Sequence, residues 1–203
     1  MSSTAIPSLD DSAELTHTLP VANAVPVRER LLNAAFTVIR ETGRVAQPQV
    51  AKAAGVPQGH LTYYFPKKLD LLKAVGARFA EEISGELTAA MAGFDPGEPS
   101  ADQSEIRGTV LRFVTDRKRT RTLVGLIGEG EKHPEVLEGL RRGADMMRSI
   151  ISHINGLESD EPRVHFILAS IWGIALQHLL FVERSDSETE SLLQALYDTV
   201  DSW

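Results

Sequence analysis

Apolar residues recur at three- and four-residue spacing along most of this chain, and this spacing predicts helices. In the first periodic segment, residues 27–42, the apolar positions that share one face are Leu31, Leu32, Ala35, Phe36 and Ile39. Gly43 follows as a C-terminal stop. A short helix is expected over about residues 48–54, with Pro48 at its first position, where a missing N–H is tolerated. Another short helix is expected over about residues 58–64.

Longer helices are predicted in the rest of the chain. One runs from about residue 67 to residue 92, and the composition of residues 93–103 indicates a loop. Further helices are expected at about 104–117, 119–130, 135–155, 162–184 and 187–201. Because no segment shows the alternating pattern of a strand, we predict an all-α fold with about nine helices.

The two short helices are separated by a single glycine, which is typical of a helix-turn-helix. The segment from residue 47 to residue 68 reads QPQVAKAAGVPQGHLTYYFPKK. Ala51 is the small residue at which the two helices are expected to touch, and Gly55 supplies a left-handed turn without a Cβ penalty. The side chains expected to point inward are Val50, Ala54, Val56, Leu61 and Tyr64.

Charge is distributed unevenly along the chain. The formal net charge of −7 argues against a nonspecific nucleic-acid binder. Residues 26–73 nevertheless hold eight Lys or Arg and three acids, whereas residues 1–25 hold three acids and no Lys or Arg. A basic segment on an acidic remainder suits a polyanion-binding head on a separate domain, although ordinary variation of surface charge produces the same pattern.

The amino-acid composition excludes several classes of protein and of functional site. Of the 203 residues, 42% are hydrophobic, so the chain can bury a sizeable core. The absence of Cys excludes disulfides, thiolate zinc sites and cysteine nucleophiles. We find no apolar run of about 18 residues and no signal peptide, and we therefore expect a soluble cytoplasmic protein.

The helix expected over residues 58–64 is the candidate reading helix, because a major groove admits an α-helix whose exposed side chains reach base edges. Gln58 offers a donor and acceptor pair suited to adenine, Gly59 allows close backbone approach, and Tyr63 presents a face for a thymine methyl. Core packing is the alternative role for both tyrosines of this helix. The residues assigned to phosphate contacts are Gln47, His60, Thr62, Tyr64 and Lys68.

Three successive segments resemble the tetracycline-repressor (TetR) family of bacterial transcriptional regulators. They are RERLLNAAFTVIRETG, VAKAAGVPQGHL and YYFPKKLDLL, which lie within residues 28–72 in the family's order and spacing. Four features in combination make the resemblance specific. They are the helix that precedes the helix-turn-helix, the glycine-centred turn, the Tyr64-Phe65 pair and the segment Lys68-x-x-Leu71-Leu72. It implies a DNA-binding transcriptional regulator, and it adds Pro48 as a position that faces the groove.

Two positions depart from the family's pattern. Thr62 stands where the family usually has Tyr, so one phosphate contact is expected to be shorter or absent. Ala46 and Gln47 stand where the family usually begins the second helix with paired threonines, and they leave a poorer N-cap. We therefore expect altered geometry and affinity at these DNA contacts.

A homodimer is expected, because one helix-turn-helix buries too little surface for high specificity, whereas two read half-sites about one helical turn (~34 Å) apart. The resemblance implies pairing through the last two helices. Their apolar residues, of which a part is expected inside each subunit, are Phe166, Ile167, Leu168, Ile171, Ile174, Leu179, Leu180, Leu192, Leu193, Leu196 and Val200.

The resemblance also implies a pocket for a small-molecule effector. Its candidate lining residues, each of which is ordinary core in the alternative interpretation, are Phe113, Met146, Met147, Ile150, Trp172 and Gln177. The glycines that could mark close approach or movement of helices are Gly125, Gly128, Gly130, Gly139 and Gly143.

These expectations divide the chain into a disordered tail (1–25), a helix-turn-helix DNA-binding domain (26–72) and an effector-binding and dimerisation domain (73–203). The expected function is a repressor released from a palindromic operator by an effector, with activation as the alternative. Such a protein would be nucleoid-associated when bound to DNA.

Two other classes compete with this interpretation. An enzyme would need a built site, but His133, His153, His165 and His178 form no His-x-x-x-His pair, have no carboxylate at ligand spacing, and no Gly-rich phosphate loop occurs. We therefore predict no enzyme activity, cofactor or metal. A helical interaction protein would lack the salt-dependent affinity for duplex DNA that a regulator shows.

Overall fold

The computed structural model describes residues 25–92, 94 and 103–203. Within these residues the chain forms nine α-helices and no strand, which confirms the all-α prediction. The predicted tail, residues 1–25, lies outside the described residues apart from Val25. Most of the predicted loop at residues 93–103 also lies outside them.

The first three helices form a compact head. They are α1 (Val27–Thr42), α2 (Gln47–Ala54) and α3 (Gln58–Tyr64). Gly43 ends α1 with φ 73°, and Gly55 ends α2 with φ 63°; both are left-handed conformations that glycine adopts without steric cost. The turn geometry expected from the two glycines is therefore present.

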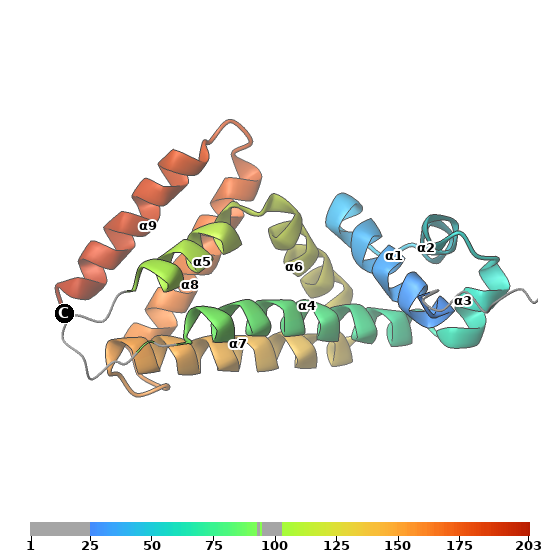
Figure 1. Cartoon of the computed structure of the whole chain (residues 1–203), viewed down its shortest axis with the longest axis horizontal. Helices are drawn as coiled ribbons and strands as arrows, with labels where there is room; N and C mark the ends of the chain where they lie inside the picture. The colour runs from blue at the N-terminus through green and yellow to red at the C-terminus, as the bar shows by residue number, and fades with distance from the viewer. Residues whose placement is uncertain (1–24, 93, 95–102) are drawn as a thin grey trace, which may run out of the picture.

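The fourth helix, α4 (Lys68–Ala90), leaves the head and runs into the body (Figure 1). The remaining helices are α5 (Ser104–Thr115), α6 (Arg117–Gly130), α7 (Pro134–Asn155), α8 (Pro162–Leu180) and α9 (Asp186–Asp201). Helices α4 and α7 pack along each other, and α8 and α9 lie at the end of the molecule far from α3 (Figure 1).

Several helix ends differ from their predicted positions, and at the starts of α6 and α9 a capping side chain sets the end. Asp116 caps α6, since its Oδ1 accepts from the N–H groups of Lys118 and Arg119 at 2.9 and 3.0 Å, so the break falls earlier than expected. Ser185 and Glu188 form a capping box at the start of α9. Helix α8 ends at Leu180 instead of residue 184, and α4 spans 68–90 instead of 67–92.

Two hydrophobic cores divide the described residues. The first contains the inward faces of α1 to α4 and also includes Leu126 of α6 and Val136 of α7. The second joins the end of α4 to α5, α7, α8 and α9. The expected boundary between residues 72 and 73 lies inside α4, so the head and the body share a continuous helix and part of one core.

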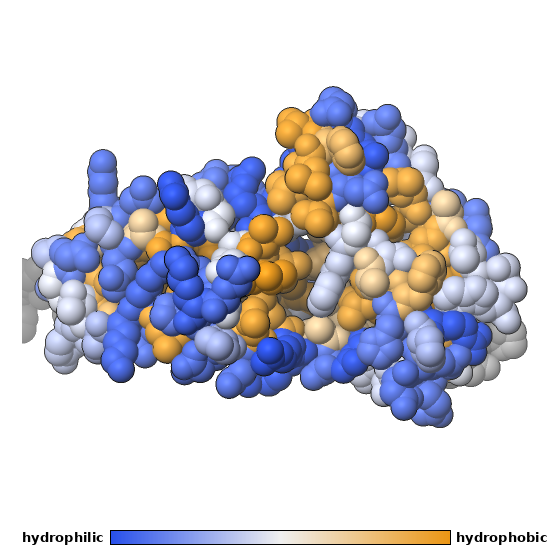
Figure 2. Space-filling model, turned by 180° about the vertical axis from the view of Figure 1, so that it is seen from behind, coloured by the Kyte–Doolittle hydropathy of each residue, from blue (hydrophilic) through white to orange (hydrophobic). Residues whose placement is uncertain are grey.

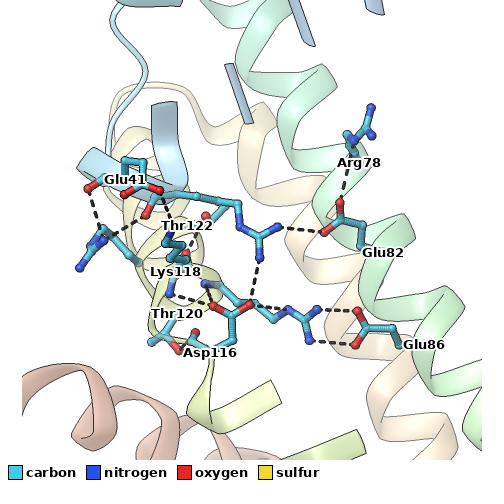
Figure 3. A network of polar contacts seen from close by, with 11 residues as sticks. Glu41, Arg78, Glu82, Glu86, Asp116, Lys118, Thr120 and Thr122 are labelled. Carbon is cyan, nitrogen blue, oxygen red and sulfur yellow. Dashed lines mark hydrogen bonds and ion pairs between the residues drawn. The ribbon is translucent and has the colours of Figure 1, made fainter. Parts of the chain in front are cut away.

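A polar network ties α1 and α4 to the start of α6 (Figure 3). The Arg40 guanidinium donates to Asp116 Oδ2 at 2.9 Å. Arg119, which is buried, donates through two nitrogens to both carboxylate oxygens of Glu86, at 2.9 and 2.5 Å. Two-pronged guanidinium–carboxylate contacts fix geometry as well as charge, so the network holds α6 in one orientation against the head.

Helices α1 and α6 also approach through their backbones. A Cβ placed on Gly125 would lie 2.2 Å from the carbonyl oxygen of Gly43, so only glycine fits at position 125. Beside this contact, Arg121 Nη1 donates to the Arg40 carbonyl at 3.1 Å. Of the glycines expected to mark close approach, Gly125 therefore marks the junction of head and body.

Helix α8 is the one described helix that is long and apolar enough, by length and composition, to cross a membrane, with a mean hydropathy of 1.3. One of its faces lies in the second core through Val164, Ile167, Ile171 and Ile174. The core-facing side thus explains part of its apolar character.

Candidate nucleic-acid interface

Helix α3 has one buried face and one exposed face. Leu61 is fully buried in the first core and anchors the helix against α1 and α2. The other positions singled out on this helix are all exposed, namely Gln58, Gly59, His60, Thr62, Tyr63 and Tyr64. The predicted reading helix therefore presents a continuous polar and aromatic surface to solvent, as contact with a major groove requires.

The two tyrosines of α3 belong to this exposed surface. Tyr63 is 78% exposed and Tyr64 38% exposed, and their rings meet edge to face with centroids 5.0 Å apart. The expectation that Tyr64 points inward is therefore wrong, because the neighbouring Phe65 fills that place in the core. Val56 lies partly buried against the same core.

The start of α2 lies beside this surface. Helix α2 begins at Gln47, so Pro48 is its second residue; Gln47 is half-buried and Pro48 is exposed. Its N-cap is Ala46, which offers no side-chain hydrogen bond, as the sequence predicted. Thr62 of α3 donates its hydroxyl to the carbonyl of Gln58 at 3.3 Å, so this hydroxyl already has a partner within its own helix.

Lys68 is held by the body. Its Nζ lies 2.6 Å from Glu129 Oε1 at the end of α6, in a partly buried ion pair. The N–H of Lys67 is also engaged, since it donates to Asp70 Oδ2 at 3.0 Å. A phosphate at the start of α4 would therefore meet a lysine whose position depends on α6.

The remaining head cations serve two purposes. Arg30 donates to the Ala54 carbonyl at 2.7 Å and so caps the end of α2, and Arg40 belongs to the junction with α6. Lys52 and Lys67 are exposed, and neither makes an ion pair with a described residue. Part of the basic charge of the head thus stabilises the fold, and part is free to meet a polyanion.

Comparison with known protein families matches residues 31–75 to the family described as bacterial regulatory proteins, tetR family. The head of this chain, from α1 into the start of α4, therefore matches the TetR family. A curated relative, the HTH-type transcriptional regulator CymR of Pseudomonas putida, is 28% identical over 169 residues, which are 77% of this chain and 81% of the relative. These matches support a TetR-family transcriptional regulator with a DNA-binding helix-turn-helix head.

Solved structures share its fold. A transcriptional regulator from Rhodococcus sp. Rha1 matches with a TM-score of 0.70 at 19% identity, covering 85% of this chain and 95% of that chain. The multidrug binding protein EbrR complexed with imidazole matches with a TM-score of 0.61 at 21% identity, covering 85% and 96%. The predicted arrangement, an N-terminal helix-turn-helix head on a helical body, is thus confirmed.

The residues proposed for an effector pocket lie in different places. Phe113, Met147 and Trp172 line one narrow cavity of about 30 Å³ between α4, α5, α6, α7 and α8. Met146 instead accepts from the Ser84 hydroxyl at 2.8 Å, and Gln177 is exposed on α8. Ile150 packs beside the second core and does not line this cavity.

Sequence reasoning missed other residues of this cavity, including Phe79, Ile83 and Leu140. Leu140 and Ala144 lie seven and three positions before Met147 in α7, a helical spacing that could have identified them.

The histidines do not converge. The described residues contain no group of three or more His, Asp or Glu side chains that could hold a metal ion. His165 is exposed on α8, whereas His178 of the same helix is buried and its Nδ1 lies 2.8 Å from Thr189 Oγ1 of α9. Burial lowers the pKa of His178, and the nearby Arg117 charge adds to this effect.

Hydrophobic side chains gather on the surface at the top of the molecule, where α8 connects to α9 (Figure 2). The exposed large apolar residues on these helices and their connection are Phe166, Leu176, Leu180, Phe181, Val182 and Leu192. Of the apolar residues assigned to the last two helices, Ile167, Leu168, Ile171, Ile174, Leu193 and Leu196 are buried within the subunit. The buried residues therefore mark the inner faces of α8 and α9, and the exposed residues mark their outer faces.

Proposed function

We propose that this regulator represses transcription by binding a palindromic operator as a homodimer and that a small-molecule effector releases it. The observation that carries the proposal is the exposed outer face of α3 opposite fully buried Leu61. Such a helix is held rigidly from one side and is free on the other, which allows it to enter a groove without refolding. Repression requires no more than occupancy of the operator.

Base and phosphate contacts are divided according to side-chain chemistry. Gln58, Gly59 and Tyr63 are the proposed base-edge contacts, and Pro48 adds an apolar contact from α2. The proposed phosphate contacts are Gln47, His60, Thr62, Tyr64 and Lys68. All but Gln47 and Lys68 are exposed, and these two are half-buried.

The exposed apolar surface of α8 and α9 supports the proposed dimer. Burying Leu180 and Val182, which are 64% and 72% exposed, against a second copy would remove apolar area from water. A two-fold arrangement would then present two α3 helices to half-sites of one duplex. We accordingly assign residues 26–72 to DNA binding and residues 73–203 to dimerisation and effector binding.

The effector is proposed to bind in the body beside Phe113, Met147 and Trp172. This cavity is lined almost entirely by apolar side chains, and EbrR, which shares the fold, is a multidrug binding protein. The proposal includes no catalytic step and no cofactor, and it places the protein in the cytoplasm, where the DNA is accessible.

Sequencing of DNA fragments retained by the purified protein tests the proposal. We expect an enriched inverted repeat, an affinity that falls steeply with rising salt through counterion release, and a dimer in solution. Metabolites are then screened for release of the retained DNA. Retained fragments without a shared repeat, or an affinity independent of salt, would instead support a helical interaction protein.

Two variants distinguish base-edge contacts from phosphate contacts. Gln58→Ala is expected to relax preference at one base pair per half-site, at a cost of ~1–3 kcal/mol. Lys68→Ala is expected to weaken binding to all sequences alike. Ser159→Ala, at an exposed position between α7 and α8, serves as the control and should leave both quantities unchanged. Full sequence preference in Gln58→Ala would refute the assignment of this residue.

A further inference from the structure

Two buried polar atoms at one place in the body lack partners. Among the described residues, the buried side-chain atoms without a hydrogen bond are Arg107 Nε of α5 and Tyr197 Oη of α9. The Arg107 guanidinium lies 4.6 Å from the centroid of the Tyr197 ring, so the two groups are packed together. An unsatisfied buried polar group costs about 1–3 kcal/mol, and a pair of them at one position indicates an absent partner.

Both residues line a cavity of about 60 Å³ between α5, α7, α8 and α9. A buried water needs roughly 10–15 Å³ measured in this way, so the space accommodates a small organic group. Its apolar walls come largely from isoleucines, namely Ile106, Ile151, Ile154, Ile167 and Ile171. No residue of this cavity lines the one beside Phe113, Met147 and Trp172, and a third cavity lies between them, because it shares Phe113 and Met147 with that one and Val110 and Ile171 with this one.

The two unpartnered groups are both donors. The Nε–H of arginine can only donate, and the guanidinium carries a permanent positive charge. Burial raises the pKa of Tyr197 to about 12, so its hydroxyl keeps its proton at neutral pH. Arg107 Nη2 lies 3.3 Å from Asp201, but that carboxylate is largely exposed and the contact leaves Nε free.

We propose that this cavity binds a small aliphatic carboxylate, whose oxygens accept from Arg107 Nε and Tyr197 Oη while its hydrocarbon part lies against the isoleucines. A carboxylate matches two unpartnered donors on neighbouring residues and a positive charge, and a short branched chain matches the narrow apolar walls. The proposal concerns ligand binding alone and does not require that the protein bind DNA.

Calorimetric titration of the full-length protein with isovalerate and with its uncharged amide, isovaleramide, tests the proposal. Isovalerate is expected to bind once per chain, and isovaleramide at least tenfold more weakly, because hydrogen bonds to charged groups contribute ~1.5–3 kcal/mol. Tyr197→Phe and Arg107→Gln are each expected to weaken isovalerate binding by ~10-fold or more. Equal binding of acid and amide, or no saturable binding up to ~10 mM, would overturn the assignment.

Matched controls separate this role from a structural one. Tyr64→Phe in the head and Arg142→Gln, at an exposed position of α7 nine residues before Ile151, remove the same groups away from the cavity and should leave isovalerate binding unchanged. Without ligand, Tyr197→Phe should unfold at the same temperature as the parent or higher, because it removes an unsatisfied hydroxyl. Marked destabilisation, or unchanged isovalerate affinity, would show that the hydroxyl has another role.

Discussion

The head and the body of this regulator are packed differently. The inward side chains of α1 to α4 form a dense core in which Leu31, Ile39, Val50 and Leu61 are fully buried. The body contains small cavities between α4, α5, α7 and α8, of which the one beside Trp172 is an example. A core anchored by fully buried side chains holds α3 in one position, whereas the internal cavities of the body can accommodate ligands.

The largest expected effect concerns the packing of the head. Leu61→Ala should lower the free energy of unfolding by ~2–5 kcal/mol, because it leaves a cavity in a closely packed site. Tyr63→Ala, on the opposite face of the same helix, should change stability by less than ~0.5 kcal/mol. Urea unfolding of both variants measures the difference. Similar losses for the two would show that α3 is not anchored from one side.

The junction between head and body gives the next largest effect. Gly125→Ala should destabilise the protein by ~1–3 kcal/mol, because its Cβ would collide with the backbone of Gly43. Gly128→Ala in the same helix meets no atom within 4 Å and should stabilise by ~0.5–1 kcal/mol through helix propensity. Opposite shifts in melting temperature are therefore expected. If Gly125→Ala is tolerated, α1 and α6 do not rely on close backbone contact.

The difference between the head and the body also explains which features could be predicted from the sequence. The turn at Gly55 and the exposed face of α3 follow from local geometry, which a short segment encodes by itself. Tyr64 was misassigned because periodicity does not distinguish it from the adjacent Phe65 as the core aromatic.

In the body, contacts join residues far apart in the chain. Arg107 and Tyr197 were not identified, because no pattern in the sequence brings α5 to α9. Gln177 was proposed for the pocket, but α8 turns it to the outside, where it accepts from Arg184 at 3.1 Å. Tertiary packing decides which side of a helix faces the core, so the sequence pattern alone does not place these side chains.

Within the body, a buried histidine should make stability depend on pH. Thr189 donates its hydroxyl to the Ser185 carbonyl at 3.1 Å, so the Nδ1–H of His178 must donate to Thr189. Arg117 Nε donates to His178 Nε2 at 3.3 Å, which requires the neutral ring.

The pKa of His178 is lowered in the folded state. The stability that the neutral ring contributes to the fold is therefore complete above pH 6.5, the ordinary pKa of histidine, and is lost as the pH falls below that value. The melting temperature of the parent should therefore decrease from neutral to acidic pH more steeply than that of His178→Gln. An equal decrease in the two proteins would mean that other titratable groups cause the pH dependence of the melting temperature. His165→Gln, at an exposed position of α8, is the control and should resemble the parent.

The smallest expected effect links the two regions through Lys68 and rests on its proposed phosphate contact. Glu129→Gln removes the ion pair that holds this lysine on α6, and exposed or partly exposed pairs contribute ~0.2–1 kcal/mol. DNA affinity at low salt, measured by fluorescence anisotropy, should therefore rise up to ~5-fold.

A general charge effect must be distinguished from release of this one side chain. Glu131→Gln removes the same charge two residues further on, at an exposed position, and should raise affinity less. In a Lys68→Ala background, Glu129→Gln should have no effect beyond that of Glu131→Gln, because the lysine it would release is absent. Equal gains in both backgrounds would mean that α6 does not restrain Lys68.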